Sequence, residues 1–238
     1  MTNLSEQTLA EIVTNDHRTA TVLEKYSLDF CCKGKRTLTD ACAEKGLSVD
    51  NVLAELQPVL EMPAQKHLPF TEMSAELLVS FIVTHHHYYV KQIMPQLYAH
   101  LEKVATKHGN RFPFMIEVFN LFTQVQEEMS LHMQKEERIL FPAIIKAEQA
   151  FASKENAGMA CSIINGAVAV MEKEHDEAGG LMEAINQLTN NYQPPADACN
   201  TFRLSLAELK EFEEDLHRHV HLENHILFPK AAEYCASV

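Results

Sequence analysis

The segment HMQKEERILFP, residues 132–142, has a near copy 87 residues further on, HVHLENHILFP, at residues 219–229. In each copy a histidine precedes a glutamate by four residues and the segment ends in Leu-Phe-Pro, which gives the pairs His132 with Glu136 and His219 with Glu223. Side chains four residues apart lie on one face of an α-helix. Each pair can therefore bind one side of a metal site.

A further histidine precedes each pair at a similar distance: His86 lies 46 residues before His132, and His175 lies 44 residues before His219. All of these candidates lie in otherwise apolar helical stripes, where a charged group is costly without a partner such as a metal. Four histidines and two carboxylates on four helical segments favour a dinuclear iron centre inside a four-helix bundle.

The first of these ligands lies in a run of three histidines, His85 to His87. Successive helical residues point about 100° apart, so we expect only one of the three to face the core well. His86 shares its stripe with Ile82 and Ile93 and is the predicted ligand, and His85 is the alternative.

Apolar periodicity predicts an all-α chain with a small helical domain over residues 1–62, a linker over 63–70 and an up-down four-helix bundle over 71–238. The long helices are expected at 72–108, 113–148, 158–190 and 196–228, joined by short connections. We expect Pro95 to bend the first helix, Pro142 to perturb the second, and Pro229 to bend or end the fourth.

The amino-acid composition narrows the range of possible partners and cellular locations. A net charge of −13 argues against nucleic acid as a main partner, because phosphate binding needs patches of Lys and Arg. No apolar run approaches the ~18 residues that cross a bilayer and no secretory leader opens the chain, so we expect a cytoplasmic protein that does not contact membranes. Four cysteines are expected to be ordinary reduced thiols: Cys42, Cys161, Cys199 and Cys235.

Several polar residues near the expected site are candidates for supporting roles. Glu128 and Asp215 each precede a ligand histidine by four residues, and Glu174 is adjacent to His175. These carboxylates could orient imidazoles or carry protons near the metal, or they could make ordinary contacts at the edge of the bundle. The remaining histidines are expected at solvated or peripheral positions: His17, His67, His100, His108, His217, His221 and His225.

Cys31 and Cys32 are adjacent in a turn that Gly34 closes. Three interpretations are open: buried small residues, a redox-active pair, or thiolate ligands for transferred iron or nitric oxide. Adjacent cysteines form strained disulfides, which disfavours a structural bridge. Nearby Lys33, Lys35 and Arg36 are expected to lower a thiol pKa and favour a functional role for Cys31 and Cys32.

Together these motifs resemble the hemerythrin-like di-iron proteins that repair iron–sulfur clusters, the RIC family. Tyr-x-x-Asp-Phe-Cys-Cys-x-Gly at residues 26–34 is similar to that family's short cysteine domain, with Lys33 where a second glycine is commoner. IVTHHHYYVKQIMPQL, SLHMQKEERILFP, MEKEHDEAGGLM and HVHLENHILFP then follow in the family's order.

The resemblance implies an oxo-bridged centre of two iron ions in a protein that forms homodimers. It implies that Glu136 and Glu223 bridge the irons, and it implies these ligands: His86, His132, Glu136, His175, His219 and Glu223. It further implies a role in restoring iron–sulfur enzymes after oxidative or nitrosative damage.

Three functions follow from such a site. The first is repair of damaged iron–sulfur proteins by iron donation, with Cys31 and Cys32 delivering or accepting the metal. The alternative is an enzyme that reduces nitric oxide, with Glu128 or Glu174 as the proton carrier. Reversible binding of oxygen or nitric oxide for sensing ranks last, because no output domain is recognisable.

Overall fold

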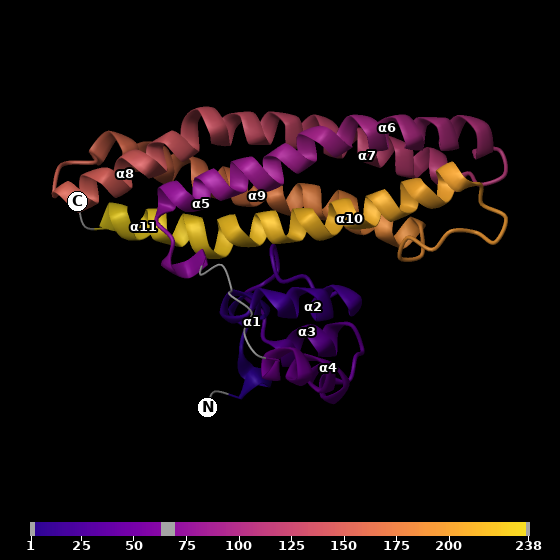
Figure 1. Cartoon of the computed structure of the whole chain (residues 1–238), viewed down its shortest axis with the longest axis horizontal. Coiled ribbons are helices and arrows are strands. Elements are labelled where there is room, and N and C mark those ends of the chain that lie inside the picture. The colour runs from indigo at the N-terminus through magenta and orange to yellow at the C-terminus, as the bar shows by residue number, and fades with distance from the viewer. Residues whose placement is uncertain (1–2, 63–69, 237–238) are drawn as a thin grey trace.

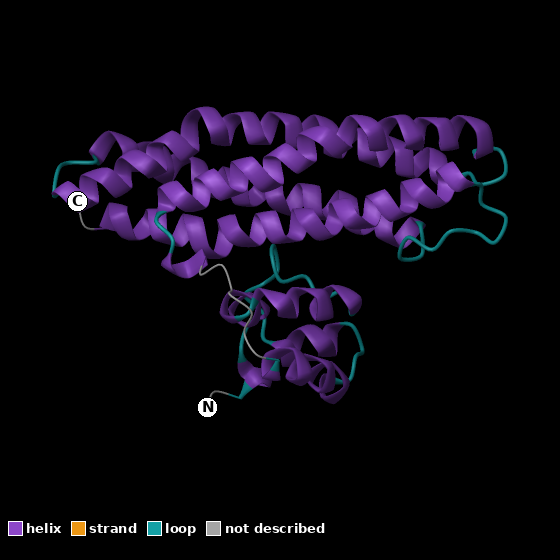
Figure 2. Ribbon diagram, in the orientation of Figure 1, coloured by secondary structure: helices purple, strands orange, loops and turns teal. Residues whose placement is uncertain are grey.

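The computed structural model describes residues 3–62 and 70–236, which form α-helices with short 3-10 and π-helical segments (Figures 1 and 2). Within these residues the one extended contact is an isolated antiparallel bridge between Thr8 and Thr37. The expected all-α class is confirmed. The predicted linker lies, except for Phe70, outside the described residues, and the domain boundaries stay a prediction.

Four long helical lines form the bundle (Figure 1). The first line consists of α5 (Ala75–Ile82), η4 (Val83–His87) and α6 (Tyr88–His108). The second line consists of α7 (Phe114–Lys135), η5 (Glu136–Leu140) and α8 (Phe141–Ser153). The third line is the single helix α9 (Gly158–Leu188). The fourth line consists of α10 (Asn200–Leu222), η6 (Glu223–Leu227) and α11 (Phe228–Ala236). The fourth line continues beyond Pro229, so the expectation that this proline might end the helix was wrong.

The segments η4, η5 and η6 are π-helical turns within otherwise α-helical lines. Two of them, η5 and η6, end at the leucine of Leu-Phe-Pro, and the prolines that follow are Pro142 and Pro229. A proline lacks the N–H that would bond four residues back and its ring collides with that carbonyl. A wider π-helical turn relieves this conflict, so the line continues as a helix. Each π turn also adds a residue and shifts the later side chains around the axis.

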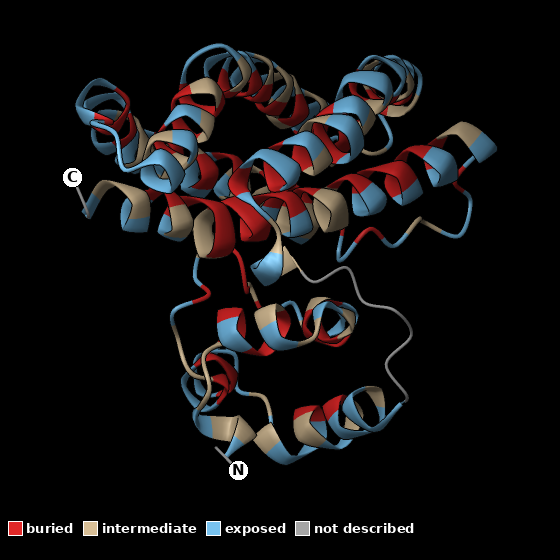
Figure 3. Ribbon diagram, turned by 60° about the vertical axis from the view of Figure 1, so that its left-hand side comes forward, coloured by how far each residue is buried: buried red, intermediate tan, exposed pale blue. Residues whose placement is uncertain are grey.

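The core consists of two hydrophobic clusters, and buried residues line the inner faces of the helices (Figure 3). Along the first line, Ile82 belongs to one cluster and Val90 to the other, with His87 between them. Along the third line, Met171 and Ala178 lie similarly on either side of His175. A buried polar layer therefore separates the two apolar parts of the bundle.

A disulfide joins Cys161, in the first turn of α9, to Cys235, in the last turn of α11. The expectation that both are ordinary thiols was wrong. The two residues are separated by 74 positions, and only the return of α11 along α9 brings them together. Nothing in the local spacing of the cysteines indicates that pairing.

The N-terminal part contains α1 (Leu9–Asn15), α2 (Ala20–Lys25), α3 (Leu38–Glu44) and α4 (Val49–Glu61). The Thr8 side chain accepts a hydrogen bond from the Glu11 N–H, and the Glu11 carboxylate accepts one from the Thr8 N–H. This capping box starts α1. This part lies against the fourth helical line, with α1 and α2 nearer to the bundle and α4 further from it (Figure 1).

Side chains of α10 hold this part against the bundle. Phe30 makes edge contacts with His217 and His221, whose ring centroids lie 5.9 and 5.6 Å away. His221 Nε2 also lies 3.3 Å from Thr14 Oγ1. The expectation that His217, His221 and His225 are peripheral was wrong, because the N-terminal part covers their face of the helix.

A carboxylate at this interface makes the docking sensitive to pH. Arg218 bonds Glu24 at 3.2 Å, and the Glu24 side chain is only 8% exposed. Burial raises the pKa of Glu24 to about 7, with Arg218 opposing and Glu214 and Glu213 adding to the rise. A raised carboxyl pKa contributes stability at low pH, and that contribution is lost as the pH rises from the ordinary 4.5 through 7.

We expect Glu24→Gln to stabilise the protein at pH 8 by about 1–2 kcal/mol, less than the full pKa shift implies because Arg218 loses its partner. At pH 4.5 the variant should gain nothing. Urea unfolding at both pH values measures the effect, with the exposed Glu61→Gln as control. Lower stability of Glu24→Gln at pH 8 would contradict this account.

Candidate metal centre

Six side chains from the four helical lines converge in the buried polar layer. Three come from α7, α9 and α10, and the other three come from the π-helical segments η4, η5 and η6. Glu136 is the first residue of η5, and Glu223 is the first residue of η6. All are at most 2% exposed. The six are His87, His132, Glu136, His175, His219 and Glu223, and they form two overlapping groups suited to a metal ion.

The imidazoles form two pairs. His87 Nε2 lies 3.1 Å from His219 Nε2, and His132 Nε2 lies 3.0 Å from His175 Nε2. Two nitrogens that bind one ion at right angles, each about 2.1 Å from it, are roughly 3.0 Å apart. Each pair therefore has the spacing of two neighbouring ligands on one ion.

Glu136 lies between the two pairs. Its Oε2 is 3.4 Å from His87 Nε2, and its Oε1 is 3.2 Å from His132 Nε2. Both oxygens are buried, and neither has a hydrogen-bond partner among the residues that the structure describes. Bare carboxylate oxygens in an apolar bundle are costly, and a cation between them and the imidazoles removes that cost.

Glu223 repeats this arrangement from the opposite side. Its Oε1 lies 3.0 Å from His219 Nε2, and its Oε2 lies 3.1 Å from His175 Nε2. Each carboxylate thus directs one oxygen to each histidine pair. The donor set fits two cations bridged by two glutamates.

The protonation of these groups reflects their mutual charge. Burial lowers the pKa of His132, but the carboxylate of Glu136 outweighs it and the pKa rises to about 9. Burial raises the pKa of Glu223, but its contacts with His219 and His175 hold that pKa well below its usual range. The raised pKa of His132 favours its charged form, and a cation bound at that imidazole would displace the proton.

The structure places a different histidine of the first line in the cluster than the predicted ligand His86. His87, and not His86, belongs to the cluster, and His85 is exposed against Phe81. The π-helical turn of η4 rotates this segment, so the α-helical spacing from Ile82 used for the sequence prediction gives the wrong residue. His86 is also buried, contrary to the expectation of a single inward histidine.

His86 has a different partner. Its Nδ1 donates to Asp215 Oδ1 at 2.9 Å, and its ring stacks on His219 with a centroid distance of 5.5 Å. Asp215 therefore orients an imidazole, as the sequence suggested, but the imidazole of His86 rather than a member of the cluster.

The ligand imidazoles are held by a ring of outer partners with a repeated design. His87 Nδ1 donates to Glu137 Oε1 at 2.8 Å, and Lys91 pairs with the same carboxylate. His132 Nδ1 donates to Glu174 Oε2 at 3.0 Å, and Lys135 pairs with that carboxylate. A carboxylate bonded to the outer nitrogen fixes the tautomer that leaves Nε2 for a metal.

Asn224 completes this ring for His175, whose Nδ1 lies 2.8 Å from Asn224 Oδ1. Glu174 was among the residues predicted from the sequence, whereas Glu137 and Asn224 were not. A signal for both exists, because each directly follows the cluster glutamate of its repeat. The fourth outer nitrogen, His219 Nδ1, is buried without a partner in the described part of the chain.

The outer nitrogen of His132 is bonded to Glu174 and not to Glu128. Glu128 is exposed and lines a cavity of about 140 Å³ together with Glu174, Glu177 and His132. Burial and the charges of Glu177 and Glu174 raise its pKa. The exposed Glu128 and the buried His132 thus line the same cavity.

Cys31 and Cys32 lie at the contact between the N-terminal part and α9. Cys31 is buried, and its thiol donates to Asp29 Oδ1 at 3.2 Å. The hydrogen bond with Cys32, burial and the Asp29 charge raise the pKa of Cys31, so the expected lowering was wrong for this thiol. Neighbouring cations pair elsewhere: Lys33 with Glu183, and Arg36 with Glu44.

Cys32 approaches the cluster from outside. Its Sγ lies 3.5 Å from the carbonyl oxygen of His175. A Cβ on Gly179, one turn further along α9, would lie 3.4 Å from this sulfur, which is an ordinary van der Waals contact. The half-buried Cys32 is thus in contact with the backbone of a candidate ligand.

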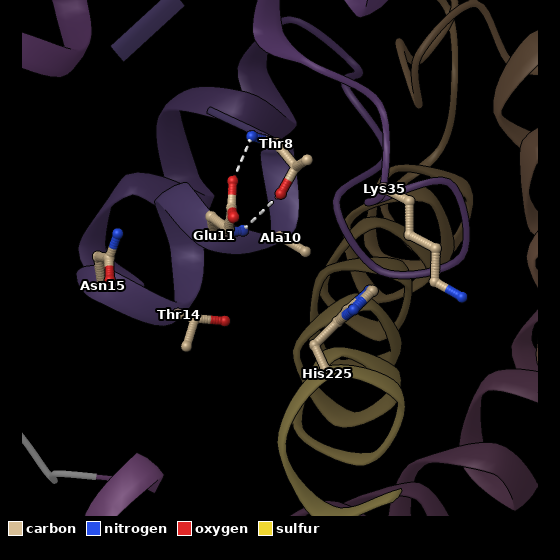
Figure 4. A pocket seen from close by; sticks show the side chains of 7 residues that line it. All are labelled: Thr8, Ala10, Glu11, Thr14, Asn15, Lys35 and His225. Atoms are coloured by element: carbon tan, nitrogen blue, oxygen red, sulfur yellow. Dashed lines mark hydrogen bonds between the residues drawn. The ribbon is translucent and has the colours of Figure 1, made fainter. Parts of the chain in front are cut away.

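A second cavity, of about 290 Å³, lies between α1 and η6 (Figure 4). Thr14 and Asn15 border it on one side, and Lys35 and His225 on the other. His225 Nε2 donates to the Cys31 carbonyl at 2.7 Å. A Cβ on Gly34 would lie 2.8 Å from this nitrogen and 2.2 Å from the Phe30 carbonyl oxygen, so only glycine permits this contact.

Comparison with known proteins agrees with the fold and the site. Residues 78–231 match the hemerythrin HHE cation binding domain, and the chain belongs to this family. Residues 5–60 match a domain of unknown function, DUF542. Among the described helices, none is long and apolar enough to cross a membrane.

Named relatives extend the similarity to nearly the whole chain. The chain is 38% identical over 226 residues to the iron-sulfur cluster repair protein YtfE of Escherichia coli O81 (strain ED1a), which covers 95% of this chain and 96% of the relative. The protein of the same name from Escherichia fergusonii gives the same identity and coverage. The resemblance seen in the sequence is confirmed.

Substitutions in the histidine run test which residue is the ligand. We expect His87→Ala to weaken metal retention by roughly 100-fold or more, because loss of even an outer partner typically costs 10–100-fold. His86→Ala and His85→Ala should retain the metal within a few-fold. Metal content per chain after dialysis against a chelator measures this, with circular dichroism to confirm folding. Equal loss in His86→Ala would contradict the assignment.

Proposed function

We propose that the cluster holds two iron ions, bridged by Glu136, Glu223 and an oxo group. The observation that carries this proposal is that each carboxylate directs one oxygen to each histidine pair. Imidazole and carboxylate donors together suit iron. When bound, such a centre supplies redox chemistry and a store of ferrous iron.

We further propose that the protein repairs damaged iron–sulfur proteins by donating this iron. Relatives that carry the repair name match almost the full length, including the part with Cys31 and Cys32. The cluster contains no thiolate, and a site of nitrogen and oxygen donors holds ferrous iron less firmly than soft ligands would hold a soft metal. The predicted homodimer and cytoplasmic location remain predictions.

In this proposal Cys32 is the first acceptor for leaving iron. It contacts the His175 carbonyl, while Cys31 is buried and hydrogen-bonded to Asp29. Asp29, Cys31 and Cys32 together form a third group with ligand atoms close enough for one metal ion. Cys31 would join after its thiol loses a proton.

The repair activity is tested with aconitase whose cluster has been damaged by peroxide. We expect iron-loaded protein, added without oxygen, to restore aconitase activity, and metal-free protein to restore none. The double variant Glu136→Leu, Glu223→Leu should bind little iron and fail to repair, while the exposed Glu117→Gln should match the wild type. Wild-type iron content in the double variant would refute the site, and failure of fully loaded protein would refute iron donation.

Nitric oxide reduction is the second candidate, and the cavity beside His132 favours it. This space could admit a diatomic gas, and Glu174 bridges from the cavity to His132 Nδ1. Two nitric oxide molecules, two electrons and two protons would give nitrous oxide and water, with Glu174 passing protons.

Headspace nitrous oxide distinguishes the two activities. If reduction occurs, iron-loaded protein supplied with electrons should form nitrous oxide, and Glu174→Gln should reduce the rate by about 10²-fold, as for loss of a positioned proton carrier. No nitrous oxide above a metal-free control would remove this candidate.

A further inference from the structure

The disulfide between Cys161 and Cys235 lies at the end of two helical lines that also carry cluster residues. His175 is 14 residues after Cys161 in α9, and Glu223 is 12 residues before Cys235 in the fourth line. At 1.5 Å per residue these separations are about 21 and 18 Å. The two lines are therefore joined covalently at one point and by the contact of His175 with Glu223 at the other.

The space between these two connections is packed with apolar side chains. Ile164 of α9 and Ala231 of α11 belong to the same buried cluster, and Phe228 stacks on the ring of His175 with a centroid distance of 6.2 Å. Movement of α11 away from α9 would thus pull Glu223 and its neighbours away from His175.

Besides the disulfide, a polar contact of Tyr234 holds the end of α11. Tyr234 donates to Glu148 Oε1 at 2.9 Å, and the same carboxylate caps α5 by accepting from the Ala75 N–H at 2.6 Å. Tyr234 ties α11 to α8 and α5, and only the disulfide ties its last turn covalently to α9.

The sulfur atoms differ in access. Cys235 is half-buried in the last turn of α11, and Cys161 is 7% exposed in the first turn of α9. A thiolate from a dithiol reductant can attack Cys235 Sγ, which breaks the S–S bond and releases Cys161 as the leaving thiolate. The N-terminus of the 31-residue α9 stabilises that negative charge.

The second thiol of the reductant then displaces Cys235, so two electrons and two protons pass from the dithiol to the cysteine pair. Closure is equally simple. Peroxide oxidises one thiolate to a sulfenic acid and yields water, and the other thiol displaces a second water as the disulfide forms.

We propose that the Cys161–Cys235 disulfide is a redox-controlled clasp that sets how fast the cluster releases its metal. Closed by peroxide, it holds α11 against α9 and slows release; opened by a dithiol, it speeds release. The effect on release rests on the proposed iron-binding function, whereas the clasp itself does not.

Iron transfer to a ferrous chelator tests the proposal. Wild-type protein is reduced or oxidised before iron is loaded, the reagents are removed, and transfer is followed without oxygen. We expect release at least threefold faster from the reduced protein. Cys161→Ser and Cys235→Ser should release at the fast rate in both treatments, and the exposed Cys199→Ser should behave as the wild type.

Thermal unfolding of the metal-free protein is the second measurement, because it reports the clasp without iron. Reduction should lower the Tm of the wild type and leave that of Cys161→Ser unchanged. If the two states release iron at equal rates while the Tm difference persists, the disulfide does not control iron release. The proposed repair function is not affected by that result. Free thiols at all six cysteines after peroxide treatment overturn the clasp itself. Absence of bound iron in both states overturns the proposed function and the effect on release together.

Discussion

Two carboxylates buried among four imidazoles are the constraint on which the bundle depends. Glu136 and Glu223 are fully buried, and apolar clusters lie on both sides of the layer that contains them. Ionised carboxylates in such a place require compensating charge. In the protein alone, protons on imidazoles such as His132 provide it, and a metal provides it more completely. The buried carboxylates therefore carry an electrostatic cost that a bound cation would reduce.

The π-helical turns make that layer possible. Each of η4, η5 and η6 contributes one of the six residues, and each lies where an α-helical line crosses the polar layer. In η5 the adjacent residues Glu136 and Glu137 both approach His87, Glu136 at Nε2 and Glu137 at Nδ1, and Glu136 also approaches His132. A regular helix spaces adjacent side chains about 100° apart, and the π turn alters that angle locally.

Much of this could be predicted from the sequence because it depends on local spacing. The pairs at positions i and i+4, the apolar stripes and the short connections predict the four lines and five of the six cluster residues. The sixth, His87, could not be predicted, because no proline stands directly after η4 in the way that Pro142 and Pro229 stand after η5 and η6. The pairing of Cys161 with Cys235 and the burial of His221 depend on contacts between distant segments, which local periodicity does not contain.

The N-terminal part is connected to the polar layer through backbone atoms rather than ligands. The turn that contains Cys31 is fixed by His225, which lies two residues after Glu223, and Gly34 leaves the space for that contact. Cys32 in the same turn touches the carbonyl of His175. The third and fourth helical lines, which carry His175 and Glu223, are thus both in contact with one turn of the small part. A change in the position of either line, caused by gain or loss of metal, would be transmitted to the cysteines without any side chain shared between the two sites.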